Sequence, residues 1–110
     1  MTALACCSLV ATAQTVPPEK RVLVFSKTAG FRHSSIPAGK TAILKLGKET
    51  GFAVDTTENA AAFTNKNLQK YSAVIFLNTT GNVLNDKQQD AFERYIQAGG
   101  GYVGIHAATD

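Results

Sequence analysis

Four short apolar runs alternate along the chain with longer segments in which apolar residues recur at helical spacing. The runs cover residues 21–26, 52–56, 73–77 and 101–106, and the third, Ala-Val-Ile-Phe-Leu, is the most continuous. Nearly continuous apolar runs are typical of strands that are covered on both faces, as in a parallel sheet. The pattern predicts the order strand, helix, strand, helix, strand, helix, strand.

Helix signals separate the predicted strands. Ser35 is a plausible N-cap, Pro37 stands in the first turn where its missing N–H costs little, and Gly51 ends the helix. One face of this helix carries the residues expected to face the core, namely Ile36, Ile43, Leu46 and Gly47.

Two further helices are predicted downstream. After a weakly structured stretch at 58–63, Thr64 caps a short helix that runs to about Tyr71. Asn85 caps the next helix, with Gln88 at the reciprocal capping-box position. That helix ends at Gly99, and its apolar face is formed by Phe92, Tyr95 and Ile96.

Strands that alternate with helices indicate an α/β fold with a parallel sheet, and right-handed crossovers place helices on both faces. The length of 110 residues allows one domain at most, and an apolar content of 45% excludes a disordered tail. The sequence stops soon after the fourth run. We therefore expect the front part of a larger domain, truncated after the fourth strand.

The N-terminal residues 1–13 resemble a signal peptide. Residues 3–11 form a small apolar stretch, and Ala11-Thr12-Ala13 has the small-x-small pattern of a cleavage site, although no basic residue precedes the stretch. We expect an exported protein that begins at Gln14 and continues through a linker to residue 20; the alternative is an untargeted tail. Both cysteines lie in the expected leader, so the mature chain has no disulfide and no thiolate nucleophile.

Charge and hydropathy argue against two classes of partner. The net charge of +3 arises mainly in residues 19–50, which hold seven Lys or Arg and two Asp or Glu. The three lysines of the first predicted helix alternate with its apolar residues, as on the solvated face of an amphipathic helix, so no nucleic-acid partner is expected. No apolar run approaches the roughly 20 residues of a transmembrane segment.

The residues that could carry chemistry follow the predicted strands. Ligands of open α/β sheets bind at the carboxyl ends of the strands, and three polar loops leave that edge here, at residues 27–34, 78–81 and 106–110. Both histidines of the chain, His33 and His106, belong to these loops. This convergence predicts a functional site at the edge.

Each candidate residue allows more than one role. His106 is a general acid/base, a metal ligand or a hydrogen-bond donor to a ligand, or else a buried histidine bonded to backbone. His33 contacts an anion or a sugar, or is a partner of His106, or is exposed beside a helix cap. Arg32 grips a carboxylate or phosphate, or is simply solvated. Asp110 orients His106 or shares a divalent metal with it, or caps a helix.

Several stretches together resemble the ThuA-like (trehalose utilisation) domain family. They are Phe31-Arg32-His33, the third strand running into Asn78-Thr79-Thr80-Gly81, the helix from Asp86 to Ala98, and residues 99–110, GGGYVGIHAATD. The resemblance covers about residues 21–110. It implies a flavodoxin-like fold, as in class I glutamine amidotransferases, with His106 where those enzymes carry a cysteine nucleophile. It therefore implies no glutaminase activity.

The resemblance also implies a role in sugar catabolism, on a sugar or keto-disaccharide. We expect a hydrolase or isomerase-like enzyme in which His106 and Asp110 are catalytic, and His33, Arg32, Asn78 and Thr79 bind the carbohydrate. A divalent metal, if present, would be held by His106 and His33. The alternatives are a non-catalytic sugar-binding or interaction module, and an inactive fragment.

Overall fold

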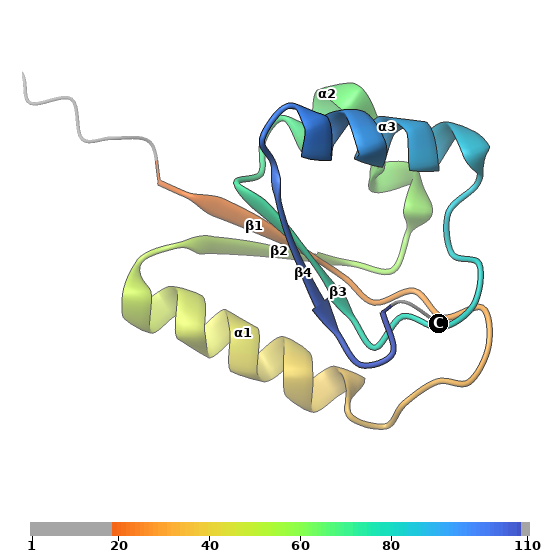
Figure 1. Cartoon of the computed structure of the whole chain (residues 1–110). Coiled ribbons are helices and arrows are strands. Elements are labelled where there is room, and N and C mark those ends of the chain that lie inside the picture. Colours follow the sequence, from red (N-terminus) through yellow and green to blue (C-terminus); the bar gives the residue numbers. More distant parts are fainter. Residues whose placement is uncertain (1–18, 109–110) are drawn as a thin grey trace, which may run out of the picture.

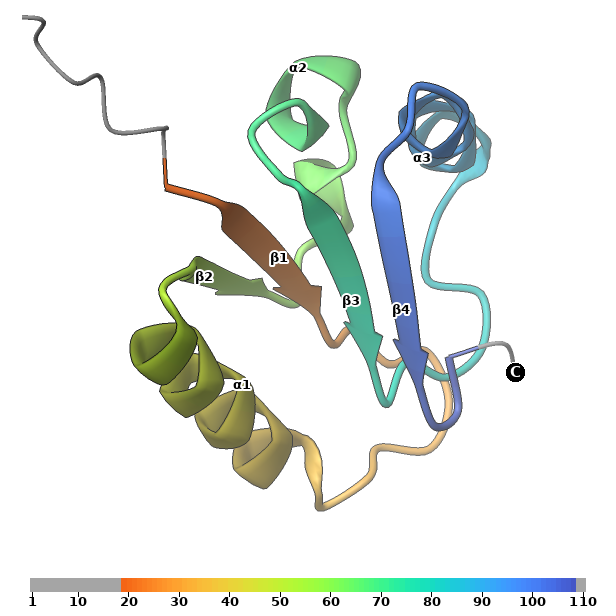
Figure 2. The same cartoon turned by 60° about the vertical axis from the view of Figure 1, so that its left-hand side comes forward.

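The computed structural model describes residues 19–108, which form a four-stranded parallel sheet. The strands lie in the order β2-β1-β3-β4 (Figure 2) and are β1 (Arg21–Phe25), β2 (Ala53–Thr57), β3 (Ala73–Leu77) and β4 (Gly101–Ile105). This is the start of the flavodoxin-like strand order. The predicted α/β fold and parallel sheet are confirmed.

Helices cover both faces of the sheet, as predicted. Helix α1 (Ile36–Thr50) lies on one face. The other face is covered by the 3₁₀ helix η1 (Ala60–Ala62), the short helix α2 (Asn65–Leu68) and α3 (Asp86–Gln97) (Figure 1). No helix among residues 19–108 has both the length and the apolar character needed to cross a bilayer.

Alternation along each strand divides the core between the two faces. On the α2 and α3 side, Leu23, Phe25 and Phe76 pack with Phe63 and Leu68. The rings of Phe25 and Phe63 meet edge to face with their centroids 4.7 Å apart, a favoured aromatic geometry. On the α1 side, a smaller cluster joins Val24, Leu77 and Ile43. The buried side chains of β1 and β3 hold the two layers together.

Helix α1 approaches the sheet along a glycine-containing stripe. A Cβ added at Gly47 would lie 2.6 Å from the carbonyl oxygen of Phe52, so only glycine permits this approach. The expectation for Leu46 was wrong, because its side chain is 51% exposed and lies beside the stripe. Gly51 ends the helix with a φ of 91°, as predicted.

The helix caps agree with the sequence in two of three cases. Thr64 accepts a hydrogen bond from the backbone N–H of Asn67, although α2 ends earlier than predicted, at Leu68. Asn85 and Gln88 form the full capping box of α3. Ser35 makes no side-chain cap on α1, because its hydroxyl donates to the side chain of Asn78 instead. Along α3, Ile96 was expected on the apolar face and is 39% exposed.

The strand order positions the site. Strand β1 lies between β2 and β3 in the sheet. After β1 the chain crosses to β2 on one side of β1, and after β2 it returns to β3 on the other side. The loops that follow β1 and β3 therefore diverge at the carboxyl edge. Ligands of doubly wound sheets bind at such a switch point. Pairing continues past the strands there, because the N–H of Ala29 donates to the carbonyl of Thr80 at 2.8 Å.

Candidate functional site

A pocket of about 770 Å³ opens at the carboxyl edge of the sheet. The loops after β1, β3 and β4 each contribute to its wall, which consists of Gly30, Phe31, His33, Thr80, Gly81, His106 and Ala107. These are the three loops that the sequence marked. The structure therefore brings both histidines of the chain into one pocket.

The two imidazoles face each other. The ring centroids of His33 and His106 are 5.1 Å apart and their planes are inclined at 70°. His106 is exposed and His33 is half-buried, so His106 is not the buried histidine of the alternative interpretation. Phe31 adds a third ring, 5.0 Å from His33, and is itself 72% exposed. The pocket thus offers two imidazole rings beside an exposed aromatic ring.

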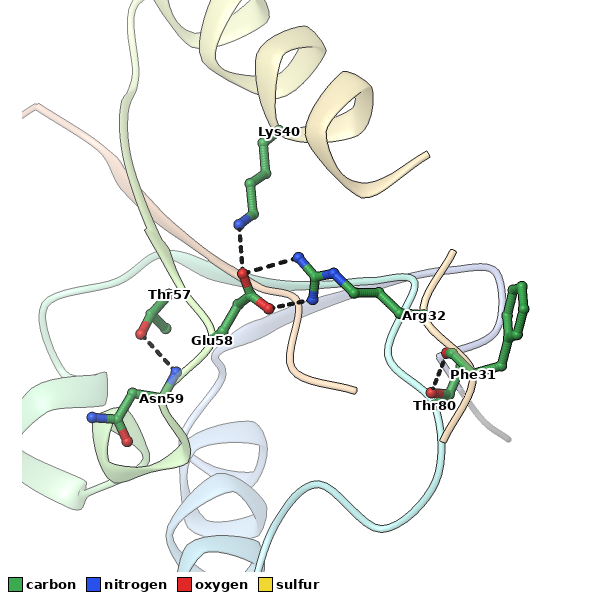
Figure 3. Close-up of polar contacts among 7 residues, drawn as sticks. All are labelled: Phe31, Arg32, Lys40, Thr57, Glu58, Asn59 and Thr80. Atoms are coloured by element: carbon green, nitrogen blue, oxygen red, sulfur yellow. Dashed lines mark hydrogen bonds and ion pairs between the residues drawn. The ribbon is translucent and has the colours of Figure 1, made fainter. Parts of the chain in front are cut away.

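The end of β3 holds the β1 loop in place. The hydroxyl of Thr80 donates to the carbonyl of Phe31 at 2.7 Å (Figure 3). Gly81 adopts a φ of 72°, and a Cβ added there would lie 3.3 Å from that of Ala29. Because the loops touch so closely, the position of Phe31 is set by backbone contacts rather than by its own side chain.

Asn78 ties the same strand end to both histidine loops. Asn78 is buried, and its backbone lies in the left-handed region with a φ of 51°, a conformation that asparagine tolerates. Its Oδ1 accepts from the Ser35 hydroxyl at 3.0 Å, and its Nδ2 donates to the backbone carbonyl of His106. Thr79 is buried as well. The structure places neither Asn78 nor Thr79 on the pocket wall.

Arg32 reaches the residue that follows β2, Glu58. Its guanidinium grips both carboxylate oxygens of Glu58, and Lys40 of α1 reaches the same carboxylate at 3.1 Å (Figure 3). The hydrogen bond from Arg32 holds the pKa of Glu58 below its ordinary value, and Lys40 adds to that effect. The same hydrogen bond raises the pKa of Arg32. Arg32 therefore binds a carboxylate of the chain itself, that of Glu58.

The pocket contains two side chains that could bind a metal ion, His33 and His106. Within residues 19–108, no three His, Cys, Asp or Glu side chains gather where they could hold a metal ion. Asp110, the third expected ligand and the expected partner of His106, lies outside the described residues, as do both cysteines and the expected leader. Among the described residues, the pocket therefore offers the imidazoles of His33 and His106 as its ionisable side chains.

The roles of two residues of this region, Glu58 and Phe31, were not predicted from the sequence. Glu58 directly follows β2, so the rule that found the other loops could have found it had the second strand been included. Phe31 was noticed only as part of a motif. Its exposure depends on how its loop folds, and no local sequence signal reports that.

Comparison with known proteins supports the resemblance. The model of the family ThuA, described as trehalose utilisation, matches residues 21–110. A crystal structure of a ThuA-like protein from Bacteroides uniformis is similar, with a TM-score of 0.70 and 29% sequence identity. The match covers 88% of this chain and 40% of that one, so the present chain spans less than half of that protein. No curated protein matches. The chain belongs to the ThuA family of trehalose utilisation.

Proposed function

We propose that the pocket between His33 and His106 binds a sugar or keto-disaccharide, and that His106 transfers a proton there. One observation carries the proposal: two imidazoles from distant loops meet 5.1 Å apart at the switch point of a parallel sheet. Membership in a family described by trehalose utilisation supports the choice of a carbohydrate.

The pocket suits a sugar in size and in surface. Its volume of about 770 Å³ lies in the range of small-molecule sites. A sugar ring has a hydroxyl-rich rim and a face of C–H groups. The imidazoles would bond to the rim, and the exposed ring of Phe31 would stack on the C–H face.

The chemistry that we propose is general acid/base catalysis. A ketone acidifies the neighbouring C–H, so an imidazole within reach can remove that proton and return it elsewhere, as isomerisation or bond cleavage next to a ketone requires. His106 is the better placed of the two, because it is exposed in the pocket and its backbone is held by Asn78. His33 would bind the adjacent oxygen.

Turnover of 3-keto-disaccharides by the wild-type chain and by His106→Ala tests this assignment. Loss of a single general acid/base should slow turnover by about 100-fold or more. Substrate affinity is measured alongside by calorimetry, so that a binding defect is separated from a chemical one. Unchanged turnover in His106→Ala would remove His106 from the mechanism.

A non-catalytic sugar-binding module is the second candidate. It would use the two imidazoles and the exposed ring of Phe31 as sugar contacts only, with no proton transfer. Saturable binding of trehalose or its keto form, without product, would support the module and exclude catalysis.

Export is part of the proposal and rests on the sequence alone. The apolar stretch and the Ala11-Thr12-Ala13 site predict cleavage before Gln14. Expression in a bacterial host, followed by N-terminal sequencing of periplasmic protein, should give a chain that begins at Gln14. Recovery of the uncleaved chain in the cytoplasm would contradict export.

A further inference from the structure

A second pocket, of about 860 Å³, opens at the same edge of the sheet. The loops after β1 and β3, which help to form the histidine pocket, also supply Lys27 and Asn82 to this one. Its other polar lining comes from the end of β2, with Thr57, Glu58 and Asn59, and from the start of α3, with Asn85 and Gln88. The two pockets are therefore neighbours, and the second has no role in the proposed proton transfer.

Three amide side chains around this pocket, those of Asn59, Asn85 and Gln88, already use their oxygens as acceptors. Oδ1 of Asn59 accepts from the N–H of Ala61 at 2.9 Å. In the capping box, Oδ1 of Asn85 accepts from the N–H of Gln88, and Oε1 of Gln88 accepts from the N–H of Asn85, both at 2.9 Å. Because a backbone N–H can bond only to the oxygen, these contacts determine which end of each amide is which.

What remains for a ligand is a set of donors. The NH₂ groups of Asn59, Asn85 and Gln88 have no acceptor among the described residues, and the side chain of Asn82 has no hydrogen bond there at all. Of the first N–H groups of α3, the capping box occupies that of Gln88. The donors available to a ligand from these residues are side-chain NH₂ groups.

The charge around the pocket is positive. Glu58 is the one acidic side chain in the lining, and its carboxylate is already bound by Arg32 and Lys40. Lys27 is half-buried and makes no ion pair within residues 19–108. A lysine without a counter-ion among the described residues, in a pocket lined by N–H donors, favours an anion that accepts several hydrogen bonds.

We propose that this second pocket binds an oxyanion, a carboxylate or phosphate group, through Lys27 and the NH₂ groups around it. Lys27 supplies the charge, and the capping amides supply donors whose orientation is set before the ligand arrives. Pre-oriented donors lose little entropy on binding. The oxyanion belongs either to a small free anion or to an acidic sugar, and both present the same group to the pocket.

Titration of inorganic phosphate into the purified chain, followed by calorimetry and by amide chemical shifts, tests the proposal. We expect saturable binding with shifts at Lys27, Asn59 and Asn82. Lys27→Met should weaken it by about tenfold or more, because a charged hydrogen bond is lost. Lys48→Met is the matched control, since it removes the same charge from an exposed position on α1 and should leave the affinity unchanged.

A second variant and three further ligands sharpen the result. Asn82→Asp adds a negative charge at an exposed lining position that holds no cap, and should abolish binding without unfolding the chain. Tighter binding of glucuronate than of acetate would assign the oxyanion to an acidic sugar, whereas equal binding would assign it to a small free anion; both support the site.

Displacement of phosphate by uncharged glucose would overturn the proposal. So would equal losses in Lys27→Met and Lys48→Met, or no saturable binding of any of the anions. Sugar binding at the His33 and His106 pocket is measured in the same series. A negative result for one pocket can then be told apart from a negative result for the other.

Discussion

The imidazole rings of His33 and His106 lie 5.1 Å apart, although one follows β1 and the other follows β4, and β3 separates these strands. Both loops must therefore bend over the end of β3. That end holds them: Thr80 binds the carbonyl of Phe31, and Asn78 binds both Ser35 and the carbonyl of His106. The pairing of the histidines thus depends on Asn78 and Thr80, which follow β3.

Asn78→Asp should destabilise the chain and displace His106. The substitution keeps the oxygen that accepts from Ser35 and replaces the NH₂ group facing the His106 carbonyl with a second oxygen. Two oxygens then face each other in a buried place, which costs about 1–3 kcal/mol. Urea unfolding measures the loss, and amide shifts near His106 report the displacement.

Ser35→Ala is the control for that change, because it removes only the contact on the other side of Asn78. It should cost about 0.5–1.5 kcal/mol and leave the signals of residues 105–107 in place. Equal effects of the two variants would show that Asn78 does not position His106 specifically.

Phe31→Ala should weaken sugar binding about 2- to 10-fold without lowering stability, since its ring is 72% exposed. Phe31→Trp should restore the affinity by restoring a stacking face. Leu44→Ala removes another exposed apolar side chain, on α1 and outside the pocket, and should have no effect. Calorimetric titration with trehalose compares the four proteins, and equal affinities would exclude stacking on Phe31.

Glu58→Gln should lower stability at pH 7 by no more than about 1 kcal/mol, because the ion pairs with Arg32 and Lys40 are partly exposed. The folded pKa of Glu58 lies below its ordinary value of 4.5, so its contribution is present above that pH and is lost as the pH falls further. Urea unfolding at pH 7 and pH 3 should show the difference disappearing. Glu49→Gln, a control on α1, should show little difference at either pH.

The free energy of unfolding should decrease at alkaline pH as Tyr71 loses its proton. Its hydroxyl donates to Asp55 at 2.7 Å, and burial, together with that carboxylate, raises its pKa to about 12 from 10.0. Because the folded pKa is the higher one, the protonated phenol stabilises the fold fully below pH 10, and the contribution is lost between pH 10 and 12. Unfolding curves should show a steeper alkaline loss in the wild type than in Tyr71→Phe. Parallel curves would contradict the assignment.

The sequence predicted the features that repeat along the chain, and missed those that depend on contacts between distant segments. Apolar runs located all four strands, and the position of His33 and His106 after parallel strands predicted that they lie at one edge of the sheet. Glu58 was missed as the partner of Arg32, because β2 and the β1 loop are adjacent only in the folded sheet.

Ser35 illustrates the same limit at short range. Its position before Pro37 is typical of an N-cap, yet its hydroxyl finds a buried acceptor on Asn78 across the sheet edge. Local propensity was overridden by a tertiary hydrogen bond. Asn78 was expected to contact substrate because it is polar and follows a strand, whereas the fold turns its amide inward.

Amide chemical-shift mapping of the wild-type chain with trehalose and 3-keto-trehalose tests the central claim most directly. We predict saturable shifts confined to the pocket wall, at Gly30, Phe31, His33, Gly81, His106 and Ala107, which are lost in a variant that combines His33→Ala and His106→Ala. Saturable shifts elsewhere on the chain, or shifts that survive the double substitution, would contradict a carbohydrate site between the two histidines.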